Sequence, residues 1–339
     1  MGLGCSTLED LVAAAPISLD VVVCTYNNAP VLDEALDTLV GQQFSPAVEW
    51  RILVVNNNCT DHTDEVVARH AGHSPVPLTM VREPEQGLTP ARLTGVARTT
   101  GDWIAFVDDD CLVAPDWIER SAEFAAEHPG CGGFGGRVVL DWEQPPREFV
   151  TRYGWAFAEQ EHGQEPKRVG SLAGAGFVFR RAALEESGWL ERHFLADRVG
   201  EKLISGGDVE MALRVGARHE LWYNPACRLR HRIPARRMTL GYLIGVTRGL
   251  GSSKLLGDSM LWAGSYPRWV VTSLAASGEW AGAALRYGAR ALLRRGGGKD
   301  ALIQLSFLRG WLAGIWRLAR MHRGERRALL GCAAPPTEG

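Results

Sequence analysis

Short β-rich runs alternate with helix-period segments between residues 19 and 107 of this 339-residue chain, and this alternation most constrains its fold. Such a pattern is typical of a parallel sheet covered by helices. After the first run, Leu32, Leu36 and Leu39 recur at helical spacing. We therefore predict an α/β fold with a mostly parallel sheet flanked by helices. The expected strands are residues 19–24, 52–55, 78–81 and 103–107.

Three of these strands end in polar clusters, at residues 25–27, 56–58 and 108–110. Ligands of open α/β sheets bind beyond the carboxyl ends of the strands, so we expect the clusters to face one cleft. The last cluster is three adjacent aspartates, whose repulsion is relieved when a cation binds. Mg²⁺ and Mn²⁺ prefer oxygen ligands and often share them with substrate phosphates. The pattern predicts a divalent cation and a phosphate-bearing ligand, with a solvated acidic loop as the alternative.

Further candidates lie outside these clusters. Thr89 reads as a helix N-cap followed by Pro90 at the first helical position, which would place Arg92 in the first turn. Asp208 follows two glycines at the start of a predicted helix, so it is either a general base or an N-cap. His231 stands between two arginines and is either a metal ligand or part of a basic surface cluster.

Six segments, taken in order, resemble the family 2 glycosyltransferases with the GT-A fold. They read VVVCTYN from residue 21, VVNNNCTD from 54, GLTPAR from 87, FVDDD from 106, GAGFVFRR from 174 and GGD from 206. The resemblance covers roughly residues 19–236 and implies a GT-A domain there. The remaining parts would be an N-terminal tail over 1–18 and a helical, partly basic C-terminal region over 237–339. The run at 115–117 and the tryptophan-rich tail resemble members that assemble bacterial exopolysaccharides.

The resemblance also implies a reaction and the residues that perform it. A sugar would pass, with inversion, from a nucleotide diphosphate sugar to a hydroxyl of a glycan or lipid-linked acceptor, in polysaccharide or glycoconjugate synthesis. The catalytic base would be Asp208, and Asp110 and His231 would bind Mn²⁺ or Mg²⁺. The residues implied for nucleotide-sugar binding are Thr25, Tyr26, Asn27, Asn57, Arg92, Asp108 and Asp109.

The chain departs from the family pattern at two places. Asn56 and Asn57 stand where the family usually has aspartate, which leaves the nucleobase of the donor open. Gly207 replaces the acidic residue that commonly precedes the base. We expect this glycine to remove a charge beside Asp208 and to alter the acceptor contacts.

Composition narrows the partners and the compartment. A net charge of −2 gives no whole-protein attraction to nucleic acid, so none is expected as a partner. Seven scattered cysteines without a C-x-x-C pair fit a reducing compartment, and no stretch reaches the roughly 18 apolar residues of a spanning helix. We expect a cytoplasmic protein.

The C-terminal region is locally basic. Residues 290–327 hold ten Lys or Arg and two acidic residues, and we expect Leu305, Leu308, Leu312, Ile315 and Ala319 to form one apolar face. Such a helix either lies on an anionic membrane surface, here the inner face of the plasma membrane, or packs on the domain.

Three rival functions remain open for the whole chain. The first is a non-catalytic sugar-nucleotide-binding subunit on the same fold. The second is a sugar nucleotidyltransferase, which would have a glycine-rich loop where Thr25 to Asn28 stand. The third is a membrane-surface module driven by the basic tail.

Overall fold

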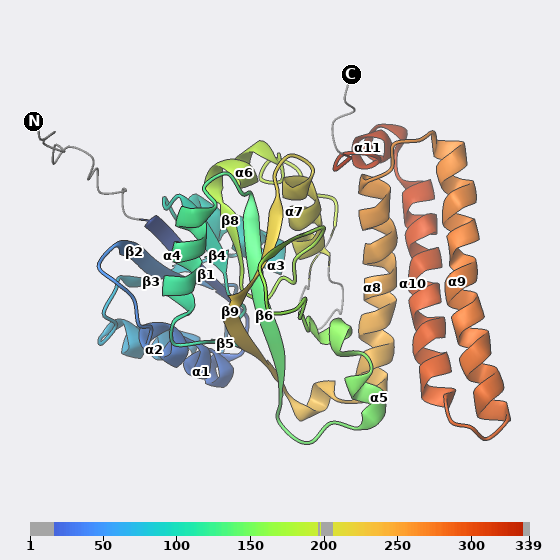
Figure 1. Cartoon of the computed structure of the whole chain (residues 1–339), viewed down its shortest axis with the longest axis horizontal. Helices are drawn as coiled ribbons and strands as arrows, with labels where there is room; N and C mark the ends of the chain where they lie inside the picture. Colours follow the sequence, from blue (N-terminus) through green and yellow to red (C-terminus); the bar gives the residue numbers. More distant parts are fainter. Residues whose placement is uncertain (1–16, 196, 198–205, 335–339) are drawn as a thin grey trace, which may run out of the picture.

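The computed structural model describes residues 17–195, 197 and 206–334. It contains one nine-stranded sheet with helices on both faces, followed by a group of long helices beside it (Figure 1). The predicted α/β class is confirmed. Residues 1–16 of the expected N-terminal tail lie outside the described residues, and the first strand begins at Ile17.

The sheet has the order β3-β2-β1-β4-β8-β6-β9-β5, with β7 paired to β9. Six strands run in one direction, while β5, β7 and β8 run against them, so the sheet is mostly parallel as predicted. The strands are β1 (Ile17–Thr25), β2 (Val48–Asn56), β3 (Leu78–Arg82), β4 (Trp103–Phe106), β5 (Cys111–Val113), β6 (Gly133–Trp142), β7 (Lys167–Val169), β8 (Phe177–Arg180) and β9 (Leu221–Ile233).

Alternate residues of β1 face two separate cores, because successive side chains of a strand point to opposite sides of the sheet. Val21 and Val23 pack toward α1 (Ala29–Val40), α2 (Thr63–Ala71) and α4 (Trp117–Glu127). Val22 packs toward α3 (Leu88–Ala97), α6 (Arg181–Glu186) and α7 (Gly207–Gly216). Both faces of the parallel strands are therefore covered, which explains their continuous apolar runs.

The start of α3 differs from the sequence prediction. Its N-cap is Gly87, with φ of 144°, and the helix begins at Leu88, so Thr89 is not the N-cap. A positive φ favours glycine, which sets the helix start before the Thr-Pro pair. Arg92 consequently lies in the second turn and not in the first. The Thr89 hydroxyl is used instead in a tertiary hydrogen bond, described below.

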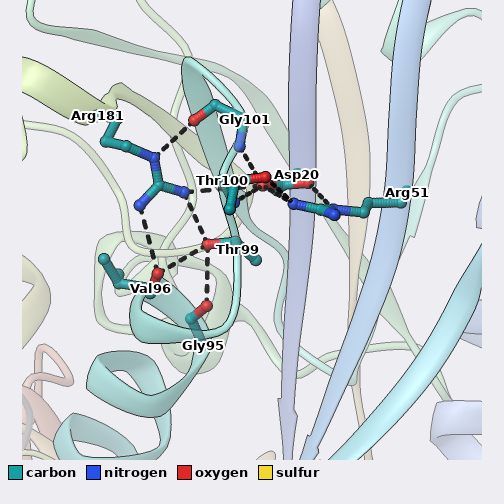
Figure 2. Close-up of polar contacts among 8 residues, drawn as sticks. All are labelled: Asp20, Arg51, Gly95, Val96, Thr99, Thr100, Gly101 and Arg181. Carbon is teal, nitrogen blue, oxygen red and sulfur yellow. Dashed lines mark hydrogen bonds and ion pairs between the residues drawn. The ribbon is translucent and has the colours of Figure 1, made fainter.

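A buried carboxylate joins the elements at the amino end of the parallel sheet (Figure 2). Asp20 on β1 is 2% exposed and forms an ion pair with Arg51 on β2. It also accepts hydrogen bonds from the backbone N–H groups of Thr100 (2.8 Å) and Gly101 (2.6 Å). Arg181 closes the network by donating to the Gly101 carbonyl at 2.7 Å. These contacts hold the loop before β4 in place, far along the strands from their carboxyl ends.

Four helices follow the sheet at the C-terminal end of the described chain. The short element η2 (Ala235–Arg237) leads from β9 to the first of them, while α5 (Glu148–Thr151) and η1 (Gly154–Phe157) lie between β6 and β7. The helices are α8 (Leu240–Met260), α9 (Tyr266–Leu292), α10 (Gly298–Arg320) and α11 (Arg323–Leu329). α8 lies beside the sheet domain, and α10 packs against both α8 and α9 (Figure 1). No helix within the described residues is long and apolar enough to cross a membrane.

The predicted apolar face of α10 is wrong. Leu312 and Ala319 are exposed, whereas α10 buries a different set: Ile303, Ser306, Phe307, Gly310, Trp311, Gly314 and Leu318. Glycines decide this packing, because a Cβ at Gly310 would overlap the backbone of α8. The sequence prediction uses only apolar residues and ignores glycine. It therefore places the buried face on a different side of α10 from the one that is buried.

Candidate functional site

One large cavity lies at the carboxyl ends of β1, β2 and β4, with a volume of about 1520 Å³. Its walls come from these strand ends, α3, η1, residues 170–175, the start of α7 and the length of α8. The structure brings all ten predicted site residues to this cavity: Thr25, Tyr26, Asn27, Asn57, Arg92, Asp108, Asp109, Asp110, Asp208 and His231. The carboxyl-end rule for α/β sheets accounts for the convergence of the first eight.

The end of β1 holds one aspartate of the triplet. Thr25 donates to Asp109 Oδ2 at 2.7 Å, and the Asn28 amide donates to Asp109 Oδ1 at 3.0 Å. Asn27 adopts a left-handed φ of 48°, and its side-chain oxygen accepts from the Thr60 N–H at 2.7 Å. Burial and the neighbouring Asp110 raise the pKa of Asp109 to about 7, against the two hydrogen bonds, which lower it. Tyr26 is 43% exposed at the mouth of this corner.

The asparagines that replace the family's aspartates have local partners. Asn56 donates to Asp64 Oδ1 at 2.7 Å, a bond that an aspartate could not donate. Asn57 donates to the carbonyls of Glu83 (3.0 Å) and Glu85 (2.6 Å), and its oxygen accepts from the Gly87 N–H at 2.8 Å. Asn57 thus shapes the loop that leads into α3, in addition to lining the cavity.

Arg92 is a buried cation between carboxylates. It is 2% exposed, and its guanidinium lies 3.2 Å from Asp197 and 3.7 Å from Asp108. Burial opposes its charge, but Asp197, Asp108 and Asp208 outweigh that cost and raise the pKa of Arg92 above its usual value. The group is therefore a permanent positive charge at the floor of the cavity, within electrostatic range of both Asp108 and Asp208.

Asp110 joins β4 to β9 and to η2. Its Oδ1 lies 3.3 Å from His231 Nε2, and its Oδ2 accepts from Arg237 Nη1 at 2.8 Å. On the other side of the imidazole, Nδ1 lies 2.7 Å from the Phe157 carbonyl. Because a carbonyl only accepts, Nδ1 donates to it; in the protonated imidazole Nε2–H faces Asp110, and in the neutral imidazole Nε2 is unprotonated and can bind a cation. Burial lowers and Asp110 raises the pKa of His231, with a net rise.

These groups fit a divalent cation. Asp108, Asp110 and Cys111 offer atoms within 4.8 Å of one another. Burial and Asp110 raise the pKa of the Cys111 thiol well above its usual value. Sulfur is a soft donor, whereas Mg²⁺ and Mn²⁺ prefer oxygen ligands. Carboxylate oxygens plus the oriented His231 Nε2 form a suitable donor set, since a histidine ligand commonly donates its other N–H to a carbonyl.

Asp208 reaches the cavity from a different element, the first turn of α7. The N-cap of this helix is Gly206, so the alternative reading of Asp208 as an N-cap is wrong. Its Oδ1 accepts from the Val209 N–H at 2.9 Å, and the positive end of the helix favours its ionised form. Gly174 packs against it so closely that a Cβ there would lie 2.5 Å from Asp208 Oδ2.

Asp197 is a site residue that sequence reasoning missed. It is 4% exposed and accepts hydrogen bonds from Thr89 Oγ1 (3.2 Å), Arg92 Nη1 (3.2 Å) and the Gly207 N–H (2.7 Å). A Cβ at Gly207 would overlap this carboxylate. The expectation that Gly207 leaves a charge missing beside Asp208 is therefore wrong, because Asp197 supplies a carboxylate there. Nothing around position 197 in the sequence marks it.

Arg237 was also missed, although it lines the cavity and contacts Asp110. It follows β9 within a run of basic residues that reads as a solvated cluster. Only the fold shows that η2 turns this side chain inward. Arg236 lines the same cavity.

The comparisons with known proteins agree with this fold. Residues 20–188 match the family model described as glycosyl transferase family 2. The chain is similar to the glucosyl-dolichyl phosphate glucuronosyltransferase of Haloferax volcanii, with 26% identity over 249 residues, 71% of this chain and 78% of that protein. It is also similar to the succinoglycan biosynthesis protein ExoM of Rhizobium meliloti, with 30% identity over 109 residues, 32% and 35% of the two chains.

A solved structure extends the likeness over most of the fold. It is a mannosyltransferase from Pyrobaculum calidifontis in complex with GDP-Man and Mn²⁺, with a TM-score of 0.58 and 21% identity over 88% of this chain and 87% of that one. The mixed sheet, with the acidic cavity at its carboxyl edge, has the GT-A fold. More narrowly, residues 20–188 form a domain of glycosyltransferase family 2.

Proposed function

We propose that this chain transfers a sugar from a nucleotide diphosphate sugar to an acceptor hydroxyl, with inversion, and that the reaction depends on Mn²⁺ or Mg²⁺. The observation that carries the proposal is one cavity lined by Asp208 on one wall and by the Asp110–His231 pair on another. A base and a cation site on separate walls suit attack on the anomeric carbon from the side opposite the departing diphosphate.

The donor would lie along the strand ends. Thr25, Tyr26, Asn27 and Asn57 would contact the base and ribose, in the roles that the family resemblance implies. Asp108 and Asp109 would hold the ribose and sugar, with Arg92 beneath them. A bound Mn²⁺ or Mg²⁺ would neutralise the charge that develops on the diphosphate. The solved relative with GDP-Man and Mn²⁺ supports this arrangement by its fold.

Side chains that line the cavity would accept the proton of the acceptor and face the negative charge of the departing diphosphate. As the bond between the anomeric carbon and the phosphate oxygen breaks, the acceptor oxygen forms the new bond and its proton passes to Asp208. Arg237 and His231, both beside Asp110, would face the released diphosphate. Because one displacement occurs, the anomeric configuration inverts.

The wall of the cavity formed by η1 and α8 carries both apolar and polar side chains. Trp155, Val246, Leu250 and Leu261 are apolar, and Ser253, Lys254 and Asp258 are polar. We propose an acceptor with both a sugar hydroxyl and an apolar part, such as a lipid-linked glycan, in glycoconjugate or polysaccharide synthesis. The Haloferax volcanii relative is named as a glucosyl-dolichyl phosphate glucuronosyltransferase, which supports a lipid-linked acceptor.

We further propose that the catalytic unit spans residues 19–236 and that region 237–339 completes it, because α8 lines the cavity. A cytoplasmic location stays a prediction.

The test is donor hydrolysis, which needs no known acceptor. The purified chain is incubated with Mn²⁺ and one UDP-, GDP- or dTDP-sugar at a time, and released nucleoside diphosphate is measured. We expect release from one donor class, lost with EDTA and in Asp110→Ala, and strongly reduced in Asp208→Asn. Glu127→Gln, which neutralises an exposed carboxylate on α4, is the control and should match wild type. Nucleotide binding without metal or release would instead support the non-catalytic subunit.

A further inference from the structure

An apolar stripe runs along most of α9 on its exposed side. Large side chains dominate it: Val271 is 68% exposed, Leu274 49%, Leu285 74% and Leu292 86%. Ala275, Gly278, Gly282 and Ala289 lie between them at helical spacing, so the stripe is continuous. From Val271 to Leu292 the stripe extends over about 32 Å, at about 1.5 Å per residue of the helix.

The stripe points away from the rest of the protein. On the opposite side of α9, Trp269 and Ser273 are buried, and Trp311 of α10 donates to the Ser273 carbonyl at 2.9 Å. Trp280 contacts Phe307 of α10 with tilted rings, whose centroids are 4.1 Å apart. Figure 1 shows α9 as the outermost helix, with α10 between it and α8. The exposed apolar side chains therefore do not belong to the surface through which α9 packs against α10.

Positive charge accompanies the stripe. Arg268, Arg286 and Arg290 lie along one side of it, and Arg294 and Arg295 follow its end; all five are exposed. The segment has a single acidic residue, Glu279. None of the five arginines forms an ion pair with a carboxylate among the described residues. The face thus combines apolar surface with free positive charge.

We propose that this face of α9 docks on an anionic lipid surface. A helix with Leu and Val on one side and Arg beside them lies in the plane of a membrane, with the apolar face among the acyl chains and the cations at the headgroups. A second copy of the chain fits the charge less well. If two α9 helices paired in parallel, each arginine would lie beside the same arginine of the second copy. If they paired antiparallel, Arg268 would lie near Arg290, so like charges would meet in both cases.

The docking face overlaps the basic region expected from the sequence only at its end. That expectation covered residues 290–327, whereas the stripe runs from Val271 to Leu292 on α9, and the face shares Arg290, Arg294 and Arg295 with the basic region. The proposal does not depend on the donor or the acceptor. It would bring the enzyme to the surface where a lipid-linked acceptor resides.

The test is co-flotation of the full chain with vesicles. We expect binding to vesicles with roughly one third phosphatidylglycerol, little binding to pure phosphatidylcholine, and loss of binding when salt rises from about 0.1 M to about 1 M. The double variant Leu285→Glu/Leu292→Glu should bind at least about tenfold more weakly. Arg286→Gln and Arg290→Gln should each weaken binding about fivefold.

Two controls make the test decisive. Val139→Glu places the same charge at a residue that is 43% exposed on β6, and it should bind like wild type. All variants change exposed residues outside the cavity, so donor hydrolysis and the melting temperature should not change. Equal binding by Leu285→Glu/Leu292→Glu would overturn the proposal, as would a wild-type dimer that this variant converts to monomer in light scattering. Lost flotation with intact hydrolysis would leave the proposed function standing.

Discussion

Asp197 offers the sharpest test of how the site is held together. Its buried carboxylate connects Thr89 and Arg92 on α3 to the backbone N–H groups of Gly206 (3.2 Å) and Gly207 (2.7 Å), directly before Asp208. Asp197→Asn keeps the shape but removes the charge and replaces one accepting oxygen with a donor. We expect this change to shift the start of α7 and leave Arg92 with less compensation.

The expected magnitude follows from these contacts. Hydrogen bonds to a charged group contribute about 1.5–3 kcal/mol each, and removing one partner of a buried ion pair costs about 3–5 kcal/mol. Asp108 at 3.7 Å still compensates Arg92 in part, so we expect Asp197→Asn to lower the free energy of unfolding by about 2–4 kcal/mol. A displacement of about 1 Å at Asp208 would reduce kcat about 100-fold.

Two assays distinguish a displaced Asp208 from a general loss of stability. Urea unfolding gives the stability change, and donor hydrolysis below the unfolding transition gives kcat and KM. Mn²⁺ affinity should stay unchanged, because Asp197 does not contact the Asp110–His231 pair. Thr89→Val is the matched control: it removes one donor to the same carboxylate, at 3.2 Å, and should cost only about 1 kcal/mol with little effect on kcat. Wild-type kcat and stability in Asp197→Asn would refute this account.

Three other predictions test separate parts of the structure. Gly174→Ala should lower kcat at unchanged Mn²⁺ affinity, because its Cβ would lie 2.5 Å from Asp208 Oδ2; an unchanged kcat would show that the base has room to move. His231→Phe should weaken Mn²⁺ binding about 10- to 100-fold in calorimetry, since it removes the oriented Nε2, and equal affinity would exclude this ligand. Asp20→Ala should lower the free energy of unfolding by about 3–5 kcal/mol in urea titration, because it leaves Arg51 and two backbone N–H groups without their buried acceptor and Arg181 without its ion-pair partner (Figure 2), while activity per folded molecule stays normal.

The local pattern of the chain was enough to predict the parallel strands and their common polar edge. Buried parallel strands require continuous apolar runs, and loops at their carboxyl ends must carry the ligand groups, so Thr25 and Asp108 could be assigned to one cleft without a structure. Order and spacing of the motifs then identified Asp208 and His231, although each alone was ambiguous. All of these residues line the observed cavity.

Tertiary structure alone decided the partners of these residues. Asp197 reaches Arg92 across more than a hundred positions of sequence, and Arg237 reaches Asp110 in the same way, so neither contact leaves a local signature. The packing sector of α10 depends on where glycines let α8 approach, which a pattern of large apolar residues does not record. The periodicity of apolar residues in the sequence shows that a helix has an apolar side. Whether that side is buried, as in α10, or exposed, as at Leu285 of α9, depends on where the neighbouring elements lie.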